Sequence, residues 1–106
     1  MTGGSREGEG PSTPGEDICS KINFDTAINS PKPQIISRLK KGDILQVDLR
    51  EDRAKTFIAV LHKDEIAGSI TERIDRLASC IREGYTFVAE VLSIDGGKIK
   101  INIRSL

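Results

Sequence analysis

The stretch "EIAGSITERIDRLASCIREG", residues Glu65 to Gly84, decides the fold because it joins a short apolar strand to a strongly periodic helix. Apolar side chains recur there at the spacing of a single helix face, and charged side chains occupy the other positions. The glycine at its end stands where a helix commonly stops. The pattern predicts the main helix over about residues 70–83, with one apolar face formed by Ile74, Leu77, Ala78 and Ile81.

The start of this helix allows two interpretations. A strand, a glycine and a helix N-terminus form the arrangement that cradles phosphate groups in many proteins, and Gly68 and Ser69 stand at that position. However, the longer glycine patterns of nucleotide-binding loops are absent. Ser69 followed by Glu72 matches a capping box, and Thr71 competes as the N-cap. We therefore expect a structural cap, with a phosphate seat at Ser69 as the alternative.

The segments on either side of this stretch alternate between apolar and polar side chains, as half-buried strands do. Three of them precede the helix and predict a meander. Two follow it, and "DGG" at residues 95–97 predicts the tight hairpin between them. The predicted strands are 43–52, 55–62, 66–68, 85–94 and 98–105.

The region before the first strand adds a short helix and one more extended segment. "SPKPQIISRLKKGD" offers Ser30 as an N-cap and Gly42 as a stop, so we expect a helix over about residues 32–40. An irregular edge strand is expected around Lys21 to Thr26. Together these elements predict a small α+β domain with a five- to six-stranded antiparallel, barrel-like sheet that the main helix closes at one end.

Residues 1–16 consist of glycine, proline, serine, threonine and charged side chains, with Met1 as the only larger apolar side chain. Such a segment buries too little surface to offset its chain entropy, so we expect a disordered tail before a single domain over residues 17–106. We find no signal-peptide pattern. No apolar run approaches the length of a membrane span, so no membrane partner is expected.

The two cysteines, Cys19 and Cys80, show neither metal-binding nor redox-motif spacing, and Cys80 falls inside the main helix pattern. We therefore expect two reduced thiols in a cytoplasmic protein. The formal net charge is zero, but residues 1–31 carry −3 and residues 32–106 carry +3. This mild basic excess is compatible with a nucleic-acid partner without requiring one.

No pattern of catalytic residues is present. The single histidine, His62, lies in or beside a polar turn with no serine or cysteine partner at a readable spacing, and we expect it to be exposed. The carboxylates near residues 48–52 alternate with basic side chains, which is typical of a solvated loop. We expect no enzyme activity, no cofactor and no metal site.

The outward face of the last strand carries the best basic stripe of the chain, at Lys98, Lys100 and Arg104. Lysines on an exposed strand usually oppose aggregation, and the alternative is contact with phosphate groups. Single-strand binders normally present several stacking rings. Because alternation predicts that the three phenylalanines face inward, Tyr85 is the one expected platform.

Residues 57–103, "FIAVLHKDEIAGSITERIDRLASCIREGYTFVAEVLSIDGGKIKINI", resemble the second half of the HIRAN-domain family, and "KGDILQVDLRED" at 41–52 resembles its earlier strand and loop. The similarity covers about residues 42–103. It implies a small barrel that binds single-stranded DNA ends, of a kind that in some bacteria stands alone. Two of the family's DNA-holding features are missing. "CSKINFDTAINSPKP" has no aromatic and glycine pocket, and "EDRAKT" replaces an Asn-Pro-x-Asp loop.

Two functions follow as hypotheses. The first is a non-enzymatic binding module for single-stranded DNA or RNA, with contacts from Lys98, Lys100, Arg104, Tyr85 and Ser69. The alternative is a protein-interaction module that pairs through an exposed strand edge or the 17–31 segment. Binding that weakens with salt and with charge reversal of the lysines favours the first.

Overall fold

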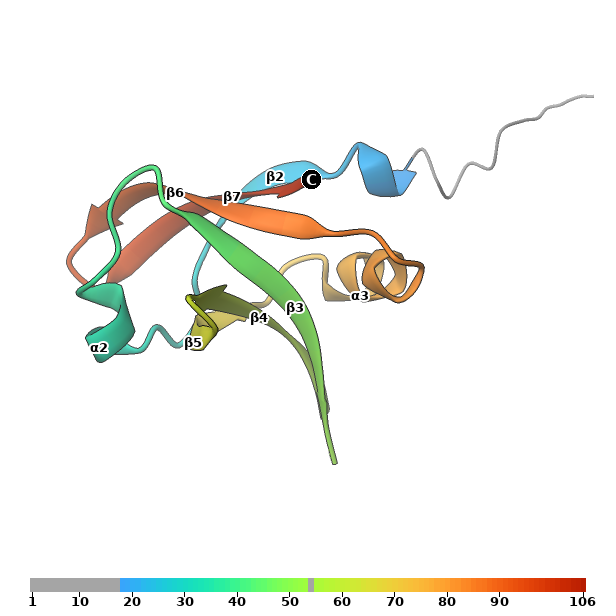
Figure 1. Cartoon of the computed structure of the whole chain (residues 1–106), viewed down its shortest axis with the longest axis horizontal. Helices are drawn as coiled ribbons and strands as arrows, with labels where there is room; N and C mark the ends of the chain where they lie inside the picture. The colour runs from blue at the N-terminus through green and yellow to red at the C-terminus, as the bar shows by residue number, and fades with distance from the viewer. Residues whose placement is uncertain (1–17, 54) are drawn as a thin grey trace, which may run out of the picture.

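The computed structural model describes residues 18–53 and 55–106, and the tail expected at 1–16 lies outside them (Figure 1). A helical turn at 18–20 comes first. The further elements are β2 (Asn23–Ala27), α2 (Pro33–Ile36), β3 (Ile44–Asp52), β4 (Lys55–His62), β5 (Glu65–Ile70), α3 (Ile74–Arg82), β6 (Phe87–Asp95) and β7 (Lys98–Ser105).

Within those residues, six strands form one antiparallel sheet in the order β2-β7-β6-β3-β4-β5. The predicted small α+β fold with a five- to six-stranded antiparallel sheet is therefore confirmed. The sheet curves but is not closed. In Figure 1, α2 lies at one end of it and α3 at the other. No helix in the described part of the chain is long and apolar enough to cross a membrane.

The two ends of the sheet approach each other just after β2. The Ile28 N–H still donates to the carbonyl of Ile99 in β7, at 3.0 Å. Asn29 then exchanges two backbone hydrogen bonds with Ser69 of β5, at 2.7 and 2.9 Å, and the Lys32 N–H donates to the Ala67 carbonyl at 2.9 Å. We call this junction of residues 28–32 with β5 the seam.

The seam explains Gly68, which is buried within β5 and does not end it. A Cβ atom at this position would lie 2.8 Å from the carbonyl oxygen of Asn29 and would also collide with the Ile28 side chain. Only glycine lets the crossing segment come this close. The glycine thus serves strand-to-strand packing and not a phosphate loop.

The continuation of β5 to Ile70 also changes the start of the main helix. Ile58 still pairs with Ile70 in the β4–β5 ladder, so α3 begins only at Ile74. The N-cap residue is Arg73, in the left-handed conformation with φ 56°, and no side chain caps the helix. The predicted caps at Ser69 or Thr71 are therefore wrong, because the backbone of Ser69 belongs to a strand.

The helix α3 and the β6–β7 hairpin show where periodicity predicts well. Leu77 and Ala78 are buried as expected, while Ile74 and Ile81 are partly buried against the core. Asp95 pairs with Lys98 across a two-residue turn that begins at Gly96, where φ is 62°. The inward residues of β7, which are Ile99, Ile101 and Ile103, are fully buried.

The cysteines contradict the expectation of free thiols. Cys19 and Cys80 form a disulfide, with Cα atoms 5.7 Å apart. Their sequence separation is 61 positions, with 60 residues between them, and both are almost completely buried, at 4% and 3% exposure. The bond fastens the turn at 18–20 to α3. No local spacing reveals this pair, because the folding of the chain alone brings the two residues together.

The short helix α2 is also smaller than predicted. It covers Pro33–Ile36 with Lys32 as N-cap and no side-chain cap. Ser30 has a positive φ of 52° and does not cap it. Hydrogen bonds such as Leu39 N–H to the Ile36 carbonyl, at 3.0 Å, extend the turn to residue 39.

Candidate functional site

The outward face of β7 carries the basic side chains that the sequence singles out. Lys98 and Lys100 are exposed and form no ion pair with any carboxylate in residues 18–53 and 55–106. Arg104 is different, because its Nη1 lies 2.8 Å from Oε1 of Glu90 and 3.1 Å from Oδ1 of Asn102. The stripe therefore offers two available lysines, and its arginine is already partnered.

The expected aromatic platform is not openly presented. Tyr85 is half-buried and packs against the hydrophobic core. Its backbone N–H donates to the Cys80 carbonyl at the end of α3, at 3.0 Å. Tyr85 thus lies in the α3–β6 connection and packs on the core. It does not present an open stacking surface beside the β7 lysines.

Ser69 lies in an open hollow of about 440 Å3 on the outside of the seam. Residues 29–32 form one wall, and β4 and β5 form the floor. We call it the seam hollow. Its lining residues are Asn29, Ser30, Lys32, Asp52, Lys55, Phe57, Ile66, Gly68 and Ser69.

The seam hollow contains the ring of Phe57, a residue that alternation assigned to the interior. Phe57 pairs with Arg50 of β3, and both share the outward face, while the neighbouring Ile58 is fully buried. The Lys55 Nζ lies over the Phe57 ring, 5.9 Å from its centroid. This places a cation above an aromatic face at the surface, a favourable contact between the ring quadrupole and the ammonium.

The charge of the seam hollow is positive on balance. Lys32 and Lys55 are exposed, and neither forms an ion pair within the described residues. Asp52 is the one carboxylate of the lining, and its Oδ1 accepts the Arg53 N–H at 2.7 Å. Two lysines therefore face one carboxylate that already accepts a hydrogen bond.

The seam also connects this hollow to the β7 lysines. Ala27, the last residue of β2, pairs with Lys100, and the Ile28 N–H still donates to the Ile99 carbonyl at 3.0 Å. The next residue, Asn29, pairs with Ser69, so residues 27–29 lead from β7 to the hollow. Of the predicted contacts, Ser69 lies in the hollow and Lys98 and Lys100 lie on β7, while Arg104 pairs with Glu90 and Tyr85 packs on the core.

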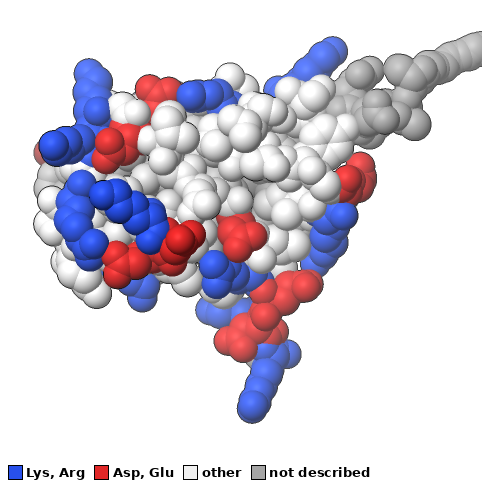
Figure 2. Space-filling view, in the orientation of Figure 1, with Lys and Arg blue, Asp and Glu red and all other residues white. Residues whose placement is uncertain are grey.

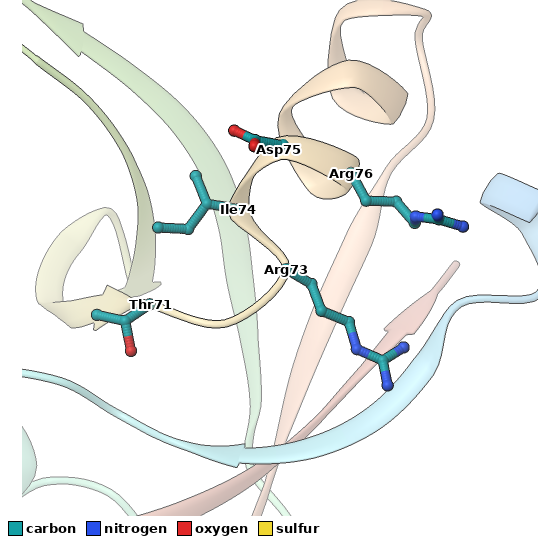
Figure 3. Close-up of a pocket in the computed structure, with 5 residues that line it drawn as sticks. All are labelled: Thr71, Arg73, Ile74, Asp75 and Arg76. Atoms are coloured by element: carbon teal, nitrogen blue, oxygen red, sulfur yellow. The ribbon is translucent and has the colours of Figure 1, made fainter.

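A second hollow, of about 730 Å3, lies at the start of α3. In Figure 3 the side chains of Arg73 and Arg76 extend away from Thr71, toward β2 and the N-terminal turn. The Arg73 guanidinium lies over the Phe24 ring, 4.6 Å from its centroid. This arginine therefore packs on β2, and the helix start shows no built anion site.

Potential metal ligands and the single histidine lie apart from one another in the described residues. No cluster of three or more potential metal ligands occurs in this part of the chain. His62 ends β4 and is half-buried, not exposed as expected, and no serine or cysteine nucleophile is hydrogen-bonded to it there.

Lys32, Lys55 and Phe57 are the site residues that sequence reasoning missed. The outward position of Phe57 was readable, because Ile58 and Val60 of the same strand are the core positions and Phe57 alternates with them. The proximity of Lys32 was not readable, since it depends on the crossing at the seam. Searches for a matching protein family, for a similar curated protein and for a similar solved structure found no match.

Proposed function

We propose that this chain is a non-enzymatic module that binds single-stranded nucleic acid at the seam hollow. The observation that carries the proposal is the gathering of the Phe57 ring, Lys32, Lys55 and Ser69 in one open hollow on the outside of the sheet. Proteins that bind single strands combine aromatic faces for the bases with cations for the backbone. The seam hollow offers both within one surface.

Each side chain has a distinct role in this proposal. A base stacks on Phe57, and Lys55 moves from above the ring to a neighbouring phosphate, which its long and flexible side chain permits. Lys32 contacts a second phosphate from the opposite wall. The Asn29 amide and the Ser69 hydroxyl lie where they can hydrogen-bond to the edge of the base.

The path of the strand continues from the hollow toward β7. Residues 27–29 lead from Ser69 to β7, where Ala27 pairs with Lys100, and in this proposal Lys100 and Lys98 contact the next phosphates. Arg104 contributes little because Glu90 already neutralises it. Tyr85 contributes no stacking in this arrangement.

Fluorescence anisotropy with a labelled single-stranded oligothymidine at low salt tests the proposal. Lys32→Glu combined with Lys55→Glu should weaken binding by about tenfold or more and flatten the dependence of the binding constant on salt, because about two phosphate contacts are lost. The matched control, Lys21→Glu with Lys41→Glu, changes the net charge equally at two exposed lysines outside the hollow. An equal loss of oligonucleotide affinity in both variants would show only a general charge effect. It would contradict binding at the seam hollow.

A protein partner is the second candidate, and one observation favours it. β3 pairs with β6 only as far as Val47, so its residues Asp48–Asp52 have no strand partner on that edge within the described chain. An extended peptide adds to such an edge through backbone hydrogen bonds. A nuclease-resistant complex that Arg50→Glu disrupts, without any oligonucleotide binding, would favour this candidate. The 18–31 segment is less suited, because β2 already pairs with β7.

Two further predictions stay as they were stated from the sequence. Membership of a HIRAN-like family and cytoplasmic location are both proposals here. The disulfide removes the argument from free thiols, since such bonds are typical of oxidising compartments. The nucleic-acid proposal rests on the seam hollow and not on either of these.

A further inference from the structure

A separate hollow of about 450 Å3 lies between the end of the α2 turn and the β4–β5 turn. We call it the α2 hollow. Its lining residues are Ser37, Arg38, Leu39, Lys40, Asp43, His62 and Lys63. None of them belongs to the seam hollow.

Positive charge dominates the α2 hollow. Lys40 and Lys63 form no ion pair within residues 18–53 and 55–106, whereas Arg38 pairs with Glu65 at 2.9 Å. The carboxylate of Asp43 accepts the Lys40 backbone N–H at 2.9 Å. Figure 2 shows lysine and arginine side chains gathered on the side of the molecule where α2 lies. Two cations therefore lack a counter-charge here.

The turn that carries Lys63 has an unusual backbone for its residues. His62 pairs with Glu65, and the two residues between them have positive φ values of 51° at Lys63 and 70° at Asp64. Two-residue hairpin turns of this kind favour glycine, asparagine and aspartate. A lysine in the left-handed region is disfavoured. Its presence there positions an ammonium group at the rim of the hollow.

His62 lines the hollow and carries a polar ring atom without a hydrogen-bond partner. The Nδ1 atom of His62 is buried and has no hydrogen-bond partner among the described residues. Buried polar atoms are rarely left without a partner, and an exception often marks a missing ion or water. An imidazole that carries its proton on Nδ1 donates to an oxygen. A small shift of this ring or of the turn would be needed to expose the atom to a ligand.

From these observations we infer that the α2 hollow binds an oxyanion of the phosphate class. Lys40 and Lys63 supply the charge, and His62 supplies a hydrogen bond from its ring. The inference concerns a site away from the seam hollow, so it stands or falls independently of the proposed function. The phosphate belongs either to a small molecule or to a nucleic-acid backbone.

The test is a titration of the whole chain with inorganic phosphate, in which chloride keeps the ionic strength constant. Amide NMR shifts should saturate and concentrate at residues 37–43 and 62–65. Lys40→Glu with Lys63→Glu should weaken binding by about tenfold or more, because charge-assisted hydrogen bonds are lost. Lys21→Glu with Arg53→Glu, at two exposed cations outside both hollows, is the matched control and should leave binding unchanged. Shifts that do not saturate, or that are equal in both variants, would overturn the inference.

The Lys63→Gly variant separates binding from structure. Glycine adopts a positive φ without penalty, so this variant should unfold at a higher temperature than the wild type while its phosphate affinity falls. Unchanged phosphate affinity in this variant would remove Lys63 from the site and overturn the inference.

Competition between inorganic phosphate and an oligonucleotide shows which class of molecule supplies the phosphate group. An oligonucleotide without terminal phosphates that displaces inorganic phosphate identifies the backbone as the ligand. Phosphate binding that such an oligonucleotide leaves unchanged identifies a small phosphorylated ligand. The variant Lys32→Glu with Lys55→Glu changes the seam hollow only. It should bind inorganic phosphate at the α2 hollow with wild-type affinity. A loss of phosphate affinity at the α2 hollow in this variant would contradict a separate site.

Discussion

The β6–β7 hairpin and the seam are two junctions of this sheet that differ in how they are made. The hairpin is local, with eight paired positions around a two-residue turn at Gly96. The seam joins residues 28–32 to β5, about 40 positions later in the chain, through three backbone hydrogen bonds and the close approach at Gly68.

The polar faces of the two regions differ as well. On the hairpin, Arg104 contacts Glu90, and Asn102 contacts Asn23 and Asp25 at 2.7 and 2.9 Å, so several polar groups already have partners. At the seam, Lys32 and Lys55 have no ion-pair partner within the described residues, and Phe57 lies between them in an open hollow. The hairpin therefore pairs its arginine and asparagine and leaves Lys98 and Lys100 without an ion pair in the described chain, whereas the seam places its unpaired lysines beside an aromatic ring.

The largest expected effect comes from removing the disulfide. Cys19→Ser with Cys80→Ser should lower the free energy of unfolding by about 4 kcal/mol, because the bond closes a long loop. The loss should be uneven. Hydrogen exchange should rise first at the Ile28 and Asn29 amides of the seam and later at the β6–β7 amides. Two results would contradict this dependence of the seam on the disulfide. One is a change in stability too small to resolve by denaturant titration, and the other is hydrogen exchange that rises equally at all amides.

Gly68→Ala tests the close approach at the seam directly. The new methyl group would overlap the Asn29 carbonyl and the Ile28 side chain, so we expect a loss of about 2 kcal/mol in the free energy of unfolding. Gly97→Ala in the hairpin is the control, since a Cβ there meets nothing within 4 Å. Denaturation of both variants gives the comparison, and equal costs would mean that the seam is not the tighter of the two regions.

The smallest expected effect concerns the ion pair of the hairpin. Arg104 and Glu90 lie 2.8 Å apart with side chains 36% and 34% exposed, so solvent screens much of their attraction. A double-mutant cycle with Arg104→Gln and Glu90→Gln should give a coupling energy of about 0.5 kcal/mol in the free energy of unfolding. A coupling energy several times larger would contradict the argument that solvent screens this ion pair.

The sequence predicts the hairpin well and the seam poorly, for a physical reason. Alternation places Ile99, Ile101 and Ile103 in the core because side chains in a strand change face at every residue. The disulfide, the buried position of Gly68 and the outward hollow all depend on segments that meet only after folding. No propensity of "EIAGSI" alone distinguishes a strand that runs to Ile70 from one that ends at the glycine.

The residues of the candidate site also divide into those that local alternation predicts and those that depend on contacts between distant segments. Lys98 and Lys100 were found from their alternation, and Ser69 was found as part of a supposed helix cap but lies in the hollow for another reason. Phe57 was assigned to the core from alternation, although its neighbour Ile58 is the fully buried residue of the two. Lys32 gave no signal, since its approach to Ala67 is set by the seam.

The most direct test of the central claim compares the affinity of Phe57→Leu and of Lys98→Glu with Lys100→Glu for single-stranded oligothymidine over a range of salt concentrations. If a base stacks in the seam hollow, Phe57→Leu should weaken binding by about tenfold with an unchanged salt slope, because stacking and not charge is lost. The lysine variant should weaken binding less and lower the slope. Wild-type affinity in Phe57→Leu would contradict the seam hollow as the nucleic-acid site.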